Sequence, residues 1–172
     1  MSSKKYIIFE VLLPLVLAGL IYLGLRPKET LVYQIFDLLG GGQFLLWFRN
    51  LFTLSSFPPW FIYSLPGGLW LLSFQNSLTW FNNFSGRKLF IYIFFSLIVG
   101  VGLEVFQFLN ITDGRFDWVD IAFYLGATLI SLSNVWLIRK KWEIYSSGSI
   151  SKLHLRIVLV VFTVIIYLAD IV

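Results

Sequence analysis

The chain has 172 residues, 58% of them hydrophobic and only 13% charged, whereas a soluble domain carries about 25% charged residues, so most of this surface faces something other than water. The absence of cysteine and the presence of a single histidine, His154, exclude disulfides, thiol nucleophiles and His-rich metal sites, and we expect no cofactor. The net charge of +4 does not indicate a nucleic-acid partner, because the basic residues flank apolar stretches and form no stripe.

Five apolar stretches are long enough to cross a membrane, since a crossing needs roughly 20 apolar residues. They cover residues 6–25, 58–76, 88–109, 117–138 and 153–171. The first follows Lys4 and Lys5 as a signal peptide would, but its apolar run exceeds the usual core of about 7–15 residues and no small-residue cleavage site follows. We therefore expect an all-α, polytopic transmembrane helical bundle of about five helices, which forms a single domain over residues 1–172.

The segment 31–52, after the first crossing, is apolar enough for a sixth crossing but carries strong interruptions. Gly40-Gly41-Gly42 divides it, and Asp37 and Arg49 add charges. A sixth crossing would also place the basic residues of the two later loops on opposite faces, against the positive-inside rule. We therefore expect an interfacial or re-entrant segment on the outer face.

The distribution of Lys and Arg over the short loops predicts the orientation. With five crossings, one face receives Lys4, Lys5, Arg87, Lys88, Arg139, Lys140, Lys141 and Lys152. The opposite face receives Arg26, Lys28, Arg49 and Arg115. The excess places the N-terminus in the cytoplasm and the C-terminus outside.

The second predicted helix contains Pro66, Gly67 and Gly68 within its span. Proline removes a backbone hydrogen bond and kinks a helix, and membranes tolerate such breaks where neighbouring helices or a cavity satisfy the freed groups. Two interpretations stay open here: a packing kink with a small-residue contact surface, or a broken helix that lines a site.

Four of the nine acidic residues fall between Glu104 and Asp120, where the third and fourth helices meet the outer face. Glu104 and Gln107 are three residues apart and share a helix face, as do Asp117 and Asp120, and Tyr124 extends the second stripe by one turn.

The turn signature Asp113-Gly114 makes the third and fourth helices antiparallel neighbours, so that their two polar faces meet. Arg115 is the only cation of this stretch, and we expect it to pair first with Glu104. Asp117 is a natural N-cap, but capping does not explain Glu104 and Gln107, which lie at a helix C-terminus. Glu10, in the first helix, is expected at the inner interface.

This cluster resembles the motif of the VanZ-like family of small bacterial membrane proteins. Glu104-Val105-Phe106-Gln107 matches its Glu-x-x-Gln, Arg115 and Asp117 match its central Arg and Asp, and Asp120 matches its helix start. Tyr124 stands where the family has Asn, and Ala127 where it has Gly. The resemblance, over residues 104–127, implies a multi-pass protein of the bacterial inner (plasma) membrane that acts in the cell envelope.

Three functions compete at this stage. The first is a non-enzymatic accessory or assembly subunit that contacts membrane lipid and another membrane protein. The second is an intramembrane enzyme that acts on a lipid or lipid-linked envelope precursor, with Glu104 as acid or base, Asp117 and Asp120 as ligands of a divalent cation, and Arg115 on a phosphate. Gln107 completes the candidate catalytic residues. The third is a small transporter, which the clustering of the charges at one face disfavours.

Overall fold

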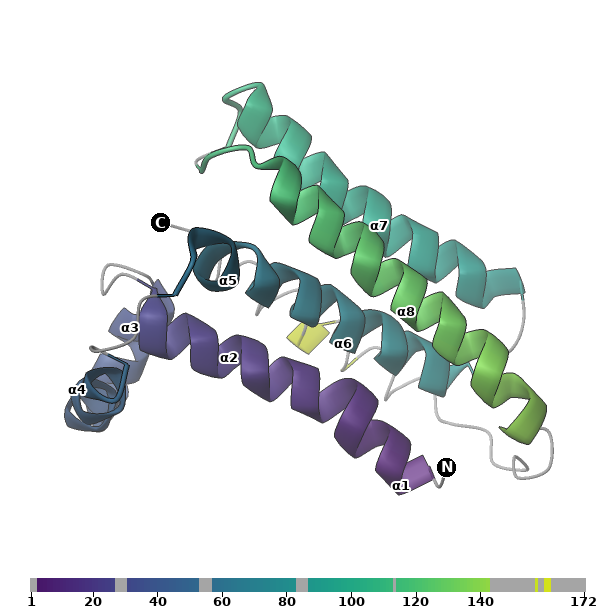
Figure 1. Ribbon diagram of the computed structural model, residues 1–172, viewed down its shortest axis with the longest axis horizontal. Coiled ribbons are helices and arrows are strands. Elements are labelled where there is room, and N and C mark those ends of the chain that lie inside the picture. The colour runs from purple at the N-terminus through teal and green to yellow at the C-terminus, as the bar shows by residue number, and fades with distance from the viewer. Residues whose placement is uncertain are drawn as a thin grey trace.

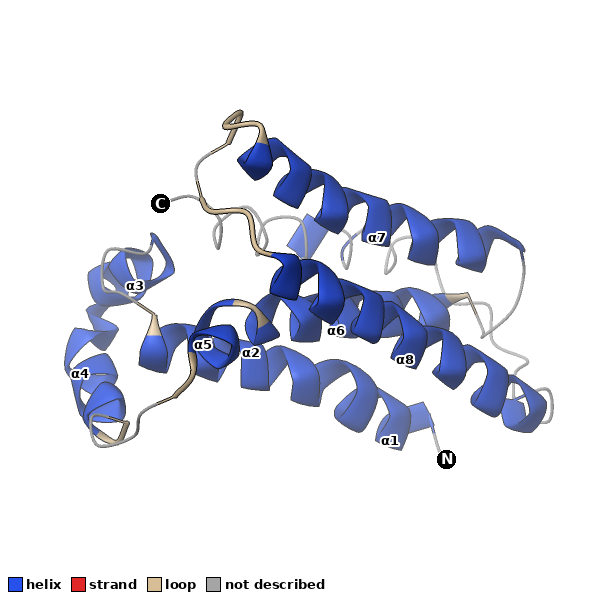
Figure 2. Cartoon of the chain, turned by 45° about the horizontal axis from the view of Figure 1, so that its top comes forward, coloured by secondary structure: helices blue, strands red, loops and turns tan. Residues whose placement is uncertain are grey.

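All regular structure that the computed structural model describes is helical (Figures 1 and 2). The described residues are 3–26, 31–52, 57–82, 87–112 and 114–142, together with 157, 160 and 161. Three helices are long and apolar enough to cross a membrane: Ile7–Leu25, Arg87–Phe108 and Trp118–Leu137. The prediction of an all-α chain with membrane-spanning helices is thus confirmed for these stretches. The fifth predicted crossing, 153–171, lies outside the described residues except for 157, 160 and 161.

The first predicted crossing consists of α1 (Ser3–Tyr6), the π-helical segment η1 (Ile7–Leu12) and α2 (Leu13–Leu25). Pro14 accounts for the π-helical segment η1. Proline has no N–H to donate to the carbonyl four residues earlier, and its ring crowds that carbonyl. The carbonyl in question belongs to Glu10, and Asn76 Nδ2 donates to it at 2.9 Å. A side chain from another helix therefore donates to a carbonyl to which Pro14 cannot donate.

The segment after α2 folds into α3 (Leu31–Phe36), the π-helical η2 (Asp37–Gly41) and α4 (Gly42–Asn50). Gly40 has φ +84°, a left-handed conformation that breaks the helix. The predicted interruption at the three glycines is confirmed. These helices lie beyond the C-terminal end of α2 (Figures 1 and 2), and their position relative to a membrane surface stays a prediction.

The second predicted crossing is divided into α5 (Pro59–Tyr63) and α6 (Leu65–Phe81), with the break at Ser64. Helix α6 alone has 17 residues, about 26 Å at 1.5 Å per residue, which is shorter than the ~30 Å hydrocarbon core. The break that the sequence predicted near Pro66 within the crossing 58–76 is therefore confirmed. The cause is Pro66, which cannot donate to the carbonyl of Ile62 and so divides the helix.

Helix α6 is the centre of the bundle, because it packs against α2, α7 and α8 (Figure 1). The long helices α7 (Arg87–Phe108) and α8 (Trp118–Trp142) agree with the predicted crossings 88–109 and 117–138. They form the predicted antiparallel pair. At the end of the bundle where α7 begins, Leu89, Ile93 and Val135 form a buried apolar cluster. We call the opposite end, where α2 and α7 end and α5 and α8 begin, the α4 end.

Candidate functional site

Glu104 connects the end of α7 to the start of α8. Its side chain is only 4% exposed, and its Oε2 atom accepts a hydrogen bond from the backbone N–H of Asp117 at 3.3 Å. A carboxylate at this position stabilises the partial positive charge of a helix N-terminus. Capping does therefore account for Glu104, although the capped helix is the neighbouring one and not its own.

Asp117 is the N-cap that the sequence predicted. Its Oδ1 atom accepts a hydrogen bond from the backbone N–H of Val119 at 2.8 Å, within the first turn of α8. Two residues with positive φ, Asn110 at 55° and Gly114 at 115°, let the preceding connection turn tightly. Gln107 lies against this turn, since a Cβ atom on Gly114 would come within 2.6 Å of Gln107 Nε2.

Arg115 is exposed in the same connection, whereas Glu104 is buried. The pairing of Arg115 with Glu104 stays a prediction, and the backbone N–H of Asp117 donates to the carboxylate. Within the described ranges, no three His, Cys, Asp or Glu side chains lie close enough together to hold a metal ion. Asp117 and Asp120, the predicted oxygen ligands, have no third such ligand among those residues.

Asp120 belongs to a different group of residues from Glu104. Its carboxylate interacts electrostatically with Asp117, with Arg26 at the end of α2, and with the hydroxyl of Ser64 between α5 and α6. The Ser64 hydroxyl is buried and near Asp120, but no hydrogen bond of ordinary geometry joins the two. A carboxylate, a hydroxyl and a guanidinium from three separate elements thus interact electrostatically at the α4 end.

Arg26 also satisfies the backbone at the Pro66 break. Its Nε donates to the carbonyl of Ile62, which Pro66 leaves free, at 3.3 Å, and its second amino group donates to the carbonyl of Tyr63 at 2.9 Å. The guanidinium lies 4.8 Å from the ring centroid of Tyr22 and 5.1 Å from that of Tyr63, so cation–π contacts fix its position.

Arg49, in α4, satisfies backbone carbonyls in the same way at the end of α2. It donates to the carbonyls of Leu23 and Arg26, and its guanidinium lies 5.4 Å from the ring of Tyr33. Sequence analysis used Arg26 and Arg49 only to predict topology. It missed their role because neither has a sequence neighbour that indicates which carbonyls it contacts.

The Pro66-Gly67-Gly68 stretch brings α6 close to α8. A Cβ atom on Gly68 would lie 2.8 Å from Cβ of Phe123, and one on Gly67 would lie 3.3 Å from the ring of Tyr124. These contacts support the interpretation as a packing kink.

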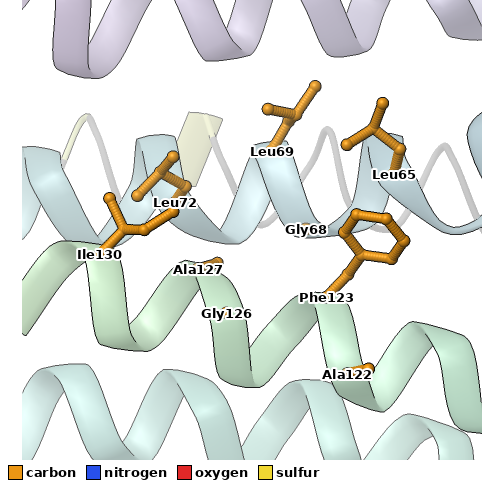
Figure 3. A pocket seen from close by; sticks show the side chains of 9 residues that line it. All are labelled: Leu65, Gly68, Leu69, Leu72, Ala122, Phe123, Gly126, Ala127 and Ile130. Atoms are coloured by element: carbon orange, nitrogen blue, oxygen red, sulfur yellow. The ribbon is translucent and has the colours of Figure 1, made fainter.

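An apolar groove of about 380 Å³ runs beside this contact, and Figure 3 shows only carbon in the side chains that line it. The lining residues are Leu65, Gly68, Leu69, Leu72, Ala122, Phe123, Gly126, Ala127 and Ile130.

A second polar cluster, which sequence analysis missed, lies in the interior around Gln75. Its Nε2 atom donates to the carbonyl of Ile93 at 3.3 Å, to the hydroxyl of Ser96 at 3.1 Å and to the hydroxyl of Thr128 at 3.0 Å. Gln75 therefore ties α6 to both α7 and α8. The adjacent amides Gln75 and Asn76 inside an apolar stretch were a signal that could have revealed this cluster.

Glu10 lies in a third polar group, next to Asn76 and Asn134. Its Oε2 atom accepts a hydrogen bond from Asn134 Nδ2 at 2.9 Å, and the same Nδ2 lies 3.4 Å from Asn76 Oδ1. Tyr6 donates from its hydroxyl to the carbonyl of Asn76 at 3.3 Å. The carboxylate expected at the inner interface thus belongs to a contact between η1, α6 and α8.

No model of a known protein family, no curated protein and no solved structure matches the chain. The resemblance to the VanZ-like family therefore stays a prediction that depends on the residues between Glu104 and Ala127.

Proposed function

We propose that the chain is an accessory or assembly subunit of an envelope complex, a VanZ-like multi-pass protein of the bacterial inner membrane. In this proposal the N-terminus is cytoplasmic and the C-terminus is outside, as the positive-inside rule favours. The three apolar helices support insertion into a membrane.

The observation that carries the proposal is the position of Glu104. The strongest candidate for an acid or base is 4% exposed and accepts a hydrogen bond from the start of α8. Asp117 is likewise engaged with the backbone of its own first turn. Two of the five candidate catalytic side chains therefore have structural tasks, which favours a protein that presents a rigid surface to a partner.

The outward faces of α7 and α8 supply such a surface. Large apolar side chains there are at least two-fifths exposed: Phe94, Phe95, Ile98, Val105, Phe106, Leu129, Ile130 and Trp136. In a membrane this surface contacts lipid tails or the helices of another protein.

Native mass spectrometry after extraction in mild detergent tests the proposal. We expect a second polypeptide in fixed ratio to the chain. Phe95→Ala, at a side chain 63% exposed on α7, should weaken that association, whereas Leu38→Ala, at a side chain 86% exposed on η2, serves as a control away from this surface. A chain that is recovered alone and acts alone in its host's envelope would refute the proposal.

The alternative is an intramembrane enzyme that acts on a lipid-linked, phosphate-containing envelope precursor. Its support is the meeting of Asp120, Ser64 and Arg26, in which a half-buried carboxylate lies beside a hydroxyl and a guanidinium. Such a set can bind a phosphate and move a proton. Conversion of a lipid-linked substrate by the pure protein, lost in Asp120→Asn and kept in Asp37→Asn, would favour this alternative.

A further inference from the structure

Helix α8 carries a polar side chain on almost every turn of the side that meets α6. These residues are Asp120, Tyr124, Thr128, Ser131 and Asn134, at spacings of three or four residues that place them on one face. Thr128 is 3% exposed and Ser131 is fully buried, although the helix is apolar enough to cross a membrane. The polar stripe therefore faces the bundle interior.

Helix α6 runs parallel to α8 and offers a matching set of groups in the same order. Ser64 lies near Asp120, Gly67 lies against the hydroxyl of Tyr124, Gln75 donates to Thr128, and Asn76 contacts Asn134. We call this line of contacts the polar seam. It continues from the α4 end to Glu10 in η1.

Three buried polar atoms among the described residues have no hydrogen-bond partner in the protein: Ser64 Oγ, Gln75 Oε1 and Ser131 Oγ. All three belong to the polar seam, at its start, in its middle and toward its far end. A buried polar atom without a partner is unfavourable, so such atoms are normally satisfied by internal water. The seam thus has the polarity that ordered water requires at three separate levels.

A carboxylate lies at each end of the polar seam. Asp120 interacts electrostatically with Ser64, Asp117 and Arg26 at the α4 end, and Glu10 accepts a hydrogen bond from Asn134 at the other. Ionisable groups inside membrane helices that are linked by polar side chains are typical of proton relays. The charged residues cluster at one face of the membrane and do not continue through the bundle, and this argued against transport. Uncharged hydroxyls and amides do continue through it.

We propose that the polar seam is a proton path between Asp120 and Glu10. A proton enters at the Asp120 carboxylate and passes along the hydroxyls of Ser64, Tyr124 and Thr128 and the water that the seam orders. Each group accepts one proton and releases another, so no covalent bond other than O–H forms or breaks. The proton reaches Glu10, where Asn134 holds the receiving carboxylate.

Proton flux into liposomes that contain the purified full chain tests the proposal. The liposomes are loaded with a pH-sensitive dye, and a potassium gradient with valinomycin drives the flux. Glu10→Gln and Thr128→Val should each reduce the initial rate about tenfold or more, because each removes an exchangeable proton from the relay. Glu10→Asp and Thr128→Ser keep that proton and should retain most of the rate.

Two substitutions outside the seam serve as matched controls. Ser133→Ala removes a hydroxyl from the exposed side of α8, and Asp37→Asn removes an exposed carboxylate, so both should leave the rate unchanged. Circular dichroism and a monodisperse elution profile establish that each variant is folded. A wild-type rate equal to that of empty liposomes would overturn the proposal. Equal rates in the wild-type protein and in folded Glu10→Gln would do the same.

Discussion

Two prolines interrupt helices of this bundle, and a different side chain donates a hydrogen bond to a backbone carbonyl at each interruption. Pro14 cannot donate to the carbonyl of Glu10, four residues earlier, and a neutral amide, Asn76, donates to it at 2.9 Å from α6. Pro66 frees the carbonyl of Ile62, and the charged Arg26 donates to it at 3.3 Å from the end of α2.

The depth of each break explains the choice of donor. Arg26 lies at the α4 end and is partly exposed, so its charge stays near water and beside Asp120. Asn76 is fully buried between helices, where an unpaired charge would be costly. The same backbone defect therefore selects a cation at the end of the bundle and an amide in its interior.

The largest effect is expected for Arg26→Ala. This substitution leaves the carbonyls of Ile62 and Tyr63 without their donor and removes two cation–π contacts, so the free energy of unfolding should fall by about 3 kcal/mol. Arg26→Lys keeps the charge but loses the forked geometry of the guanidinium. Its free energy of unfolding should therefore lie between those of the wild-type protein and Arg26→Ala. Reversible unfolding in mixed micelles, followed by tryptophan fluorescence, measures the difference. A loss below about 0.5 kcal/mol for Arg26→Ala would mean that the Pro66 break needs no donor.

Asn76→Leu should cost about 2 kcal/mol, because it removes the donor to the Glu10 carbonyl. The sharper test is a double-mutant cycle with Pro14→Ala, which supplies an N–H four residues after Glu10. We expect Asn76→Leu to cost about 1 kcal/mol less in the Pro14→Ala background. Strict additivity of the two substitutions would show that Asn76 does not compensate for Pro14.

The start of α8 extends the comparison to a helix end without proline. Glu104→Gln keeps an acceptor for the N–H of Asp117 but removes the negative charge, so the cost should be about 1 kcal/mol. Glu104→Ala removes the acceptor as well and should cost more. Thermal unfolding in detergent, followed by circular dichroism, ranks the two. Equal stability of all three proteins would indicate that Glu104 is free for chemistry.

The smallest effect concerns Asp117. Asn is as good an N-cap as Asp, so Asp117→Asn should change the free energy of unfolding by only a few tenths of a kcal/mol, whereas Asp117→Ala should cost about 1 kcal/mol. The same unfolding experiment measures both. A loss of function in a fully stable Asp117→Asn protein would assign its charge a role beyond capping.

The sequence by itself determined the features that depend on local chemistry. Twenty-residue apolar runs predicted α7 and α8, three consecutive glycines predicted the break at Gly40, and an aspartate before a helix predicted the cap at Asp117. Each follows from solvation or from backbone geometry within a few residues, so neighbours in sequence suffice to predict it.

The tertiary structure decided which polar groups meet. Glu104 reaches the start of another helix, Arg26 reaches a break 36 residues later, and Glu10 meets an asparagine 124 residues away. The spacing of the polar residues in α8 places them on one face of the helix, but it does not indicate which residues of α6 they contact. In a membrane the lipid tails are as apolar as the side chains, so hydrophobicity does not specify which helix faces pack together, and only the docked helices show which buried donor bonds to which carbonyl.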